Sequence, residues 1–303
     1  MRARGLQAHV AVLLLLVLAA CGGGSPGQAD GPAPLRISAI PDRNPAELAA
    51  REQALAGYLR QTLGVPVEYV PVTDYAASVN LFRTGDLDLV FYGGLTGVQT
   101  RRQVPDAVLL AQRDIDAHFR SVFIANRSAG LGKVDDVAGL SSLRGRRFTF
   151  GSESSTSGRL MPEYFLAAAG LKSATDFAGP PGYSGSHDLT IDLVQSGSYE
   201  AGALNVQVWQ DRVAAGTVDL SKVEVVFTTP EYHDYHWLAG PDVDDRMGQG
   251  FTDRLREALL GLDGSSPTEH QVLEGYGAKA LVATAPENYD EIEAIARQLG
   301  LLT

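Results

Sequence analysis

From residue 35 onwards the chain alternates short β-type segments with amphipathic helical segments. A strand pattern at 35–40 is followed by Asn44-Pro45, where an Asn cap and a proline at the first helical position predict a helix start. Strands that alternate with helices favour an α/β fold, with a sheet whose strands run in one direction. The alternation occurs in both halves of the chain, which predicts two lobes with a crevice at the carboxyl ends of their strands. The strands are expected at 35–40, 67–72, 87–92, 108–112, 119–125, 148–150, 201–204, 223–228 and 235–239.

The first 21 residues have the pattern of a bacterial export signal. Arg2 and Arg4 precede an apolar run at 10–18, which is too short to span a bilayer as a mature helix. The run ends in Leu-Ala-Ala before Cys21, the only cysteine of the chain, and this resembles the lipobox in which the cysteine is acylated. We therefore expect lipidation at Cys21, a signal peptide over 1–21, a flexible Gly/Pro/Ser-rich tether over 22–34, and no disulfide.

The charge of the chain excludes some classes of partner. Loss of residues 1–20 removes two arginines, so the formal net charge changes from -11 to -13. An acidic surface disfavours nucleic acid and anionic lipid as partners. It says less about a small buried anion, because such an anion is held by local dipoles and hydrogen bonds.

Residues 148–159 carry the clearest functional signal. A strand pattern at 148–150 leads through Gly151 into five hydroxyl residues and then into a helix. The first N–H groups of a helix lack intrahelical partners, and the helix dipole adds partial positive charge there. One serine is enough to cap a helix, so the run Ser155-Thr156-Ser157 predicts a turn that also holds an anion. No Gly-x-Ser-x-Gly motif frames these serines as nucleophiles.

Three further segments are expected at the same crevice. Tyr92 ends an apolar strand, and Gly93-Gly94 after it allow close approach of a ligand, although a core tyrosine and an ordinary turn are equally compatible. His187 begins a helix and can donate to an anion, or it can cap the helix or face solvent. The segment 232–237 matches no metal-binding motif, and we expect it to cross between lobes and present donors such as Tyr235. No metal and no cofactor are expected.

Five segments resemble the substrate-binding proteins of ABC importers for phosphonate, phosphite and related oxyanions. Residues 148–163 and 202–209 are most similar to a selenate-binding subgroup of that family. The resemblance implies a type II periplasmic-binding fold that closes over its ligand by a hinge motion, with 35–122 and 238–303 in lobe I and 123–237 in lobe II. The five segments are Ser-Ala-Ile-Pro-Asp (38–42), Gly-Val-Pro-Val-Glu-Tyr-Val-Pro-Val (64–72), Asp-Leu-Val-Phe-Tyr-Gly-Gly-Leu (88–95), Ser-Thr-Ser-Gly (155–158) and Gly-Ser-His-Asp (185–188).

The resemblance also implies roles for particular residues. In the family, the Ser-Thr-Ser run and the histidine of Gly-Ser-His-Asp hold the oxyanion, and a first-lobe tyrosine matches Tyr92. Phosphonate binders add acidic residues for a ligand amine. Asn205 stands close to where such a group would sit, which counts against an aminophosphonate ligand. The predicted ligand-binding residues are Tyr92, Ser155, Thr156, Ser157, His187, Asn205 and Tyr235.

The predicted donors also suggest which oxyanion is bound. A ligand that carries a proton gains from a carboxylate acceptor, whereas a fully deprotonated dianion is repelled by one. None of the predicted site residues is a carboxylate, which favours selenate or sulfate over phosphate, with an affinity that is nearly flat between pH 6 and 8. Asp42 and Asp234 are the two carboxylates that would reverse this preference if they entered the crevice.

We therefore expect an exported, lipid-anchored, monomeric receptor that delivers an oxyanion to an ABC permease and its ATPase on the outer side of the cytoplasmic membrane. Two alternatives remain open at this point. One is a sensor domain that binds the same ligand and signals to a partner. The other is a hydrolase that uses Ser155 or Ser157 with His187. Asp188 is adjacent to His187 on a helix and is therefore badly placed to orient it.

Overall fold

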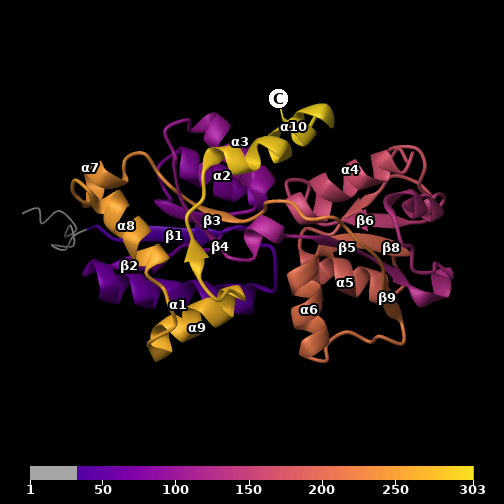
Figure 1. The fold of residues 1–303 in the computed structure, drawn as a ribbon, viewed down its shortest axis with the longest axis horizontal. Coiled ribbons are helices and arrows are strands. Elements are labelled where there is room, and N and C mark those ends of the chain that lie inside the picture. Colours follow the sequence, from indigo (N-terminus) through magenta and orange to yellow (C-terminus); the bar gives the residue numbers. More distant parts are fainter. Residues whose placement is uncertain (1–32, 303) are drawn as a thin grey trace, which may run out of the picture. The chain divides into compact units, whose positions relative to one another are not determined.

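The computed structural model describes residues 33–302. The predicted signal peptide, the predicted lipidation at Cys21 and the tether up to residue 32 lie outside the described residues. Two sheets organise the described chain (Figure 1). None of the helices within 33–302 has the length and apolar character needed to cross a membrane.

The first sheet has six strands in the order β11-β4-β10-β3-β1-β2. β1 runs parallel to both β2 and β3, whereas β10 runs antiparallel to both β3 and β4 and β11 runs antiparallel to β4. The strands are β1 (Leu35–Ala39), β2 (Val67–Tyr69), β3 (Leu89–Tyr92), β4 (Val108–Arg113), β10 (His236–Ala239) and β11 (Leu281–Val282).

Helices cover both faces of the first sheet (Figure 1). α1 packs against α8 and α9, and α3 packs against α2 and α10. α1 begins where the sequence predicts, because the side chain of Asn44 accepts hydrogen bonds from the N–H groups of Ala46 and Glu47, and it ends at Gly64 in the left-handed conformation. The helices are α1 (Pro45–Leu63), α2 (Tyr75–Arg83), α3 (Gly94–Gln103), α7 (Val243–Met247), α8 (Phe251–Leu260), α9 (Pro267–Tyr276) and α10 (Asp290–Gln298).

The second sheet has five strands in the order β7-β6-β8-β5-β9. α5 and α6 pack against β5 and β8, and α4 packs against β5. Its strands are β5 (Ser121–Asn126), β6 (Phe148–Phe150), β7 (Gly182–Tyr183), β8 (Ala201–Asn205) and β9 (Val223–Thr228). Its helices are a π-helical turn (Thr156–Leu160), α4 (Met161–Ala168), α5 (His187–Gln195) and α6 (Val206–Ala214). Short 3-10 turns lie at Asp116–His118, Arg127–Ala129, Val137–Leu143 and Pro286–Tyr289.

The expectation of strands that all run in one direction is wrong, because both sheets are mixed. β5 is antiparallel to β8 and β9, and β10 is antiparallel to β3 and β4. Both are the strands that the chain forms immediately after it crosses from one sheet to the other. Ser121 pairs with Asn205 and His236 pairs with Tyr92, so each crossing strand enters at the carboxyl end of its neighbour and runs back along it.

The chain crosses between the sheets twice, at 114–120 and at 229–235. The two crossing segments contact each other through a bridge between Phe119 and Tyr232. β5 begins just before residue 122 and β10 just before residue 237, the positions at which the sequence divides lobe I from lobe II. The exact limits of the lobes stay a prediction, and below we call the two sheets with their helices the first and the second lobe.

Candidate ligand-binding site

The hydroxyl-rich turn after β6, residues 152–157, is the centre of the candidate site and is called the hydroxyl turn below. Ser155 caps the following turn, with its Oγ accepting a hydrogen bond from the N–H of Gly158 at 2.9 Å. The N–H of Leu160 donates to the carbonyl of Ser155 at 3.0 Å, which is the wide spacing of a π-helical turn, a feature often found at functional sites. Ser155, Thr156 and Ser157 are all buried. The structure therefore presents a helix start with three buried hydroxyls.

Gly158 lets this turn pack closely against two other segments. A Cβ atom at this position would lie 3.1 Å from the Cα of Gly151 and 3.1 Å from Cε1 of His187. Both contacts are tighter than a side chain tolerates without movement of its neighbours. The glycine therefore brings the start of α5 directly against the hydroxyl turn.

His187 is completely buried at the first position of α5. Burial lowers the pKa of its imidazole to about 4, so the ring is neutral at physiological pH. Its Nδ1 accepts a hydrogen bond from the N–H of Asn205 at 3.3 Å, which leaves the ring proton on Nε2. Within the described chain, Nε2 is a buried atom without a hydrogen-bond partner. His187 is thus a neutral donor that keeps its N–H available.

Asn205 and Tyr235 meet at this point and hold the carboxylate of Asp42. The Asn205 amide donates to the Tyr235 hydroxyl at 3.0 Å, and this hydroxyl donates to Asp42 Oδ2 at 2.9 Å. The other end of the Asn205 side chain caps α6 through the N–H groups of Gln207 and Val208. Asn205 and Tyr235 therefore use their polar atoms on protein partners and position Asp42.

Asp42 is buried and ionised. Burial alone would raise the pKa of its carboxyl, but the positive charges of Arg43 and Arg51 outweigh burial and hold the pKa below its ordinary value. The carbonyl of Asp42 also accepts a hydrogen bond from the N–H of His187 at 3.0 Å. Since Asp42 follows β1 and His187 begins α5, this bond joins the two lobes.

Asp234 is a second buried carboxylate, and its environment differs from that of Asp42. Oδ1 accepts a hydrogen bond from the N–H of Gly94 at 2.9 Å, while Oδ2 has no partner within the described residues. Burial raises the pKa of Asp234 to about 7, although the Gly94 N–H and the Thr156 hydroxyl act in the opposite direction. A Cβ atom on Gly93 would lie 3.2 Å from both Asp234 Oδ1 and Thr156 Oγ1. Asp234 therefore lies directly beside the hydroxyl turn.

Two carboxylates lie among the side chains around the hydroxyl turn, a question that the sequence left open. Asp42 and Asp234 are each only 1 % exposed, and both belong to the group of side chains around the hydroxyl turn. Four buried atoms of this group lack a hydrogen-bond partner in residues 33–302, namely Ser157 Oγ, His187 Nε2, Asp42 Oδ1 and Asp234 Oδ2. Two of them can donate and two can accept. Asp42 Oδ1 faces the guanidinium of Arg43 at 3.8 Å, so Asp234 Oδ2 is the acceptor that suits a tetrahedral oxyanion carrying a proton.

The structure brings six of the seven predicted site residues together. Tyr92 is the exception, because its hydroxyl donates to the carbonyl of Ser78 at 2.9 Å and its ring packs edge-on against Phe82. A different tyrosine, Tyr75, lies beside the hydroxyl turn. Burial raises the pKa of Tyr75 well above its ordinary value, while a hydrogen bond with Ser155 lowers it. The six residues are Ser155, Thr156, Ser157, His187, Asn205 and Tyr235.

Tyr75 was missed by sequence reasoning, although a signal for it exists. It follows Asp74, which caps α2 by accepting a hydrogen bond from the N–H of Ala77 at 2.8 Å. The start of α2 is another strand-to-helix turn after β2, of the same kind as those that supplied Ser155 and His187. Applying the same criterion to every such turn would have included Tyr75.

Hydrogen bonds link the lobes on the α3 side of the site as well. The N–H of Leu95 donates to Thr156 Oγ1 at 3.0 Å, and the hydroxyl of Thr96 donates to the carbonyl of Ser154 at 2.8 Å. Leu95 and Thr96 lie in the first turns of α3, while Ser154 and Thr156 belong to the hydroxyl turn. The described conformation is therefore one in which the two lobes contact each other around the buried group.

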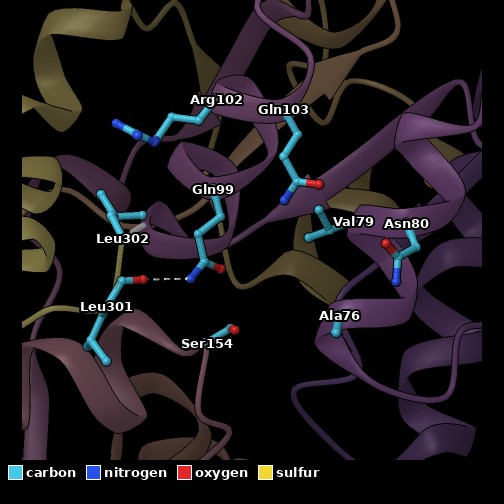
Figure 2. Close-up of a pocket in the computed structure, with 9 residues that line it drawn as sticks. All are labelled: Ala76, Val79, Asn80, Gln99, Arg102, Gln103, Ser154, Leu301 and Leu302. Carbon is cyan, nitrogen blue, oxygen red and sulfur yellow. Dashed lines mark hydrogen bonds between the residues drawn. The ribbon is translucent and has the colours of Figure 1, made fainter.

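A surface pocket of about 420 Å³ is bordered by Ser154 of the hydroxyl turn (Figure 2). Its lining includes Ala76 and Ser154, the chain neighbours of Tyr75 and Ser155. Figure 2 shows the Gln99 amide pointing to the carbonyl of Leu301, to which it donates at 3.3 Å. The buried group, with its unpartnered donors and acceptor, is the better anion site. The pocket is lined by Ala76, Val79, Asn80, Gln99, Arg102, Gln103, Ser154, Leu301 and Leu302.

Residues 37–289 match the model of a protein family described as "ABC transporter, phosphonate, periplasmic substrate-binding protein". The chain belongs to this family. The members of this phosphonate-binding family are ligand-binding components of importers rather than enzymes, and they act outside the cytoplasm with a permease and an ATPase as partners. The family predicted from the sequence is therefore confirmed.

This chain resembles known members of the phosphonate-binding family both in sequence and in fold. It is 46% identical over 269 residues to the probable ABC transporter phosphite-binding protein PhnD1 of Prochlorococcus marinus (strain MIT 9301), covering 89% of this chain and 91% of that one. It is 26% identical over 317 residues to the phosphate-import protein PhnD of Mycolicibacterium smegmatis, covering 99% and 97%. The structure of PhnD1 from Prochlorococcus marinus in complex with methylphosphonate superposes with a TM-score of 0.86, over 88% of this chain and 98% of that one.

A more distant neighbour shows how widely the fold is used. The alkanesulfonate-binding protein SsuA from Xanthomonas axonopodis pv. citri, bound to MOPS, has a TM-score of 0.60 at 14% identity, with 90% of this chain and 93% of that one covered. The predicted two-lobed α/β fold of the type II periplasmic-binding proteins is thus confirmed.

Proposed function

We propose that this chain is the receptor of an ABC importer for a small phosphorus oxyanion that carries a proton, with phosphite and methylphosphonate as the leading ligands. The observation that supports this most directly is Asp234, a buried carboxylate whose Oδ2 has no partner within the described residues and which lies beside Thr156, the chain neighbour of Ser157. The names of the Prochlorococcus relative, a phosphite-binding protein, and of its complex with methylphosphonate support the same class of ligand.

Each side chain of the site has a role in this proposal. The start of the π-helical turn, with Ser155, Thr156 and Ser157, donates to the ligand oxygens, and the Nε2–H of His187 adds a neutral donor. Asp234 accepts the proton of a P–OH group. Asn205 and Tyr235 act through Asp42, which they hold in place.

The sequence favoured selenate or sulfate as the ligand. We propose the opposite preference, for an oxyanion that carries a proton. Sulfate and selenate carry no proton at neutral pH, so neither can donate to Asp234 Oδ2. They would meet either an ionised carboxylate at close range, which is repulsive, or a protonated Asp234 that alone supplies the proton of the contact and loses it as the pH rises through about 7. A monoprotonated phosphite or phosphonate supplies the missing proton itself.

The hydrolase alternative finds no support in the contacts of His187. A serine nucleophile needs a histidine that is oriented by a third group. Asp188 does not serve here, because its oxygens accept from Arg212 and from the N–H of Asn44. The Nδ1 of His187 accepts from a backbone N–H, and this bond does not stabilise an imidazolium ion.

Membrane attachment is the second part of the proposal. We infer that Cys21 is acylated after removal of the signal peptide, and that the tether up to residue 34 connects this anchor to the folded body. The lipobox-like sequence before Cys21 supports this inference.

Calorimetry on the purified mature protein at pH 7 tests the proposed ligand. The ligands are phosphite, methylphosphonate, phosphate, selenate and sulfate, each titrated at the same ionic strength. We expect phosphite or methylphosphonate to bind most tightly, and selenate and sulfate to bind at least about 100-fold more weakly, which corresponds to about 2.7 kcal/mol. Selenate binding that equals or exceeds phosphite binding would refute the assigned role of Asp234.

A further inference from the structure

Arg43 connects a carboxylate of the site to the opposite lobe. It directly follows Asp42, and its side chain is only 10 % exposed. Its Nε lies 3.8 Å from Asp42 Oδ1, and its Nη1 lies 3.6 Å from Asp211 Oδ2. Asp211 belongs to α6 of the second lobe, whereas Arg43 follows β1 of the first lobe. The guanidinium therefore lies between two carboxylates that belong to different lobes.

The residues next to Arg43 also contact the second lobe. The N–H of Asn44 donates to Asp188 Oδ2 at 2.7 Å, and the carbonyl of Asp42 accepts from the N–H of His187 at 3.0 Å. Three consecutive residues of the first lobe thus each contact the second lobe. Two of them, Arg43 and Asn44, border a pocket of about 490 Å³. Asp188, Asp211 and Arg212 of the second lobe also line this pocket.

The charges around the site explain why a cation is needed at this position. His187 is neutral and Asp42 is ionised, so an anionic ligand enters beside a negative charge. Two arginines stabilise the charge of Asp42, namely Arg43 and Arg51. Arg51 is held in the first lobe by an ion pair with Glu52 at 2.8 Å and by the ring of Tyr276. Of these two arginines, Arg43 is the one that also contacts the second lobe.

We propose that Arg43 is a positioning residue for ligand retention: its guanidinium compensates Asp42 and, through Asp211, holds the second lobe against the first. This inference rests on the proposed function. Because the Arg43–Asp211 contact spans the two lobes, it stabilises the closed state more than the encounter with ligand. Loss of the contact therefore raises the rate of ligand release and leaves the rate of association nearly unchanged.

The two partners of Arg43 differ in exposure, which orders the expected effects. The side chain of Asp211 is 54 % exposed, so its pairing with Arg43 is partly screened by solvent. Asp211→Asn removes the link between the lobes but leaves Asp42 compensated. Arg43→Gln removes both functions and has the larger effect. Arg43→Lys keeps a charge beside Asp42 but lacks the planar guanidinium that faces both carboxylates, so it behaves like Asp211→Asn.

Stopped-flow kinetics with phosphite and with methylphosphonate test the proposal. The variants are Arg43→Gln, Arg43→Lys, Asp211→Asn and the double variant Arg43→Gln/Asp211→Asn, all in the mature protein. Arg127→Gln is the matched control, because Arg127 pairs with Glu224 at 3.0 Å within the second lobe and its loss removes one cation and one ion pair without affecting the contact between lobes. Thermal unfolding without ligand verifies that each variant is folded.

We expect Arg43→Gln to raise the dissociation rate at least about tenfold while the association rate changes by less than about threefold. Asp211→Asn and Arg43→Lys raise the dissociation rate by about three- to fivefold, and the double variant is no worse than Arg43→Gln, because the two residues act through one contact. An unchanged dissociation rate in Arg43→Gln, or additive effects in the double variant, overturns the role of Arg43. Failure of the wild-type protein to bind either ligand overturns the proposed function instead.

Discussion

Asp234 accepts a hydrogen bond from the N–H of Gly94 at 2.9 Å through Oδ1, and its other oxygen is buried without a partner among residues 33–302. The backbone N–H fixes the orientation of the carboxyl, and burial makes the carboxyl easy to protonate. A proton acceptor is thereby held beside the start of a helix that favours anions. The protein can therefore distinguish oxyanions of similar size by whether they carry a proton for Asp234.

The first prediction concerns Asp234→Asn, which removes the acceptor and replaces it in part with a donor. We expect phosphite affinity to fall by roughly 1.5–3 kcal/mol, the range for a hydrogen bond to a charged group, while selenate affinity stays equal or rises. Calorimetry with both ligands measures the change. Asp136→Asn, at the exposed cap of a 3-10 turn, serves as a control that alters charge equally. Equal losses for phosphite and selenate would contradict the role of Asp234.

The second prediction is a pH dependence of ligand affinity. Asp234 has a pKa raised to about 7, so its protonated form predominates below pH 7 and is lost above it. The complex needs at least one proton shared between ligand and Asp234, so phosphite affinity falls as the pH rises from 6 to 8.5. The flat profile expected from the sequence is thus replaced by a sloping one. Calorimetry across this range should also show that Asp234→Asn flattens the slope, and a wild-type profile without slope would contradict the assignment.

The same raised pKa affects folding in the absence of ligand. The stability that Asp234 contributes by retaining a proton is fully present below its ordinary pKa of 3.8 and is lost as the pH rises through about 7. The pKa of His187 is lowered to about 4, so its contribution is present above its ordinary 6.5 and is lost as the pH falls. The free energy of unfolding of Asp234→Asn, measured by denaturant titration, should therefore fall less steeply than that of wild type between pH 5 and 8.

The third prediction concerns the hydroxyl turn. Ser157→Ala removes a buried hydroxyl that lies near the Tyr232 hydroxyl but makes no hydrogen bond of normal geometry among residues 33–302, so we expect the loss to fall mainly on the ligand. We expect a loss of roughly 1.5–3 kcal/mol in affinity with little change in the stability of the free protein. Ser152→Ala, earlier in the same turn, is the matched control, because the Ser152 hydroxyl accepts from Ser154 N–H at 3.4 Å. Equal calorimetric affinities for both variants would place the anion elsewhere.

The fourth prediction separates two tyrosines. Tyr92→Phe removes a hydroxyl that donates to Ser78 in the core, so we expect unchanged ligand affinity and a stability loss of about 1 kcal/mol. Tyr235→Phe removes the link between Asn205 and Asp42, so we expect weaker binding. Calorimetry and thermal unfolding of both variants distinguish the two roles. A larger affinity loss in Tyr92→Phe than in Tyr235→Phe would restore the original expectation.

The fifth prediction addresses the anchor. Cys21→Ser removes the thiol that is acylated, so we expect the protein to move from the membrane fraction to the soluble fraction without a change in ligand affinity. Fractionation followed by immunoblotting measures this. Wild-type protein that appears in the soluble fraction without detergent, as the variant does, would contradict lipidation.

The predicted elements and the real ones agree closely where local signals are strong. The start of α1 at Asn44 and the hydroxyl turn at Ser155 were both predicted, because a cap and its helix are encoded within a few residues. Contacts between residues that are far apart in the chain could not be predicted from such local signals. Asp42 and Asp234 are held by Tyr235 and Gly94, which lie 193 and 140 positions away in the chain.

Tyr92 illustrates a second limit. Side chains alternate along a strand, so Phe91 and Tyr92 face opposite sides of β3. Phe91 packs against Trp237, whereas the Tyr92 hydroxyl bonds to Ser78 on α2. The sequence places Tyr92 at the end of a strand but does not say which side of the sheet faces the ligand.

The position of β10 has a consequence for the order in which the protein is completed. Leu238 of β10 pairs with Val90 of β3, 148 positions earlier, and with Leu109 of β4. A chain synthesised only as far as residue 235 contains every strand of the second sheet, yet the middle of the first sheet is missing. The lobe that begins the chain is therefore the last to be finished. A protein truncated before His236 would keep its hydroxyl turn on a complete sheet while lacking the strand that joins β3 to β4.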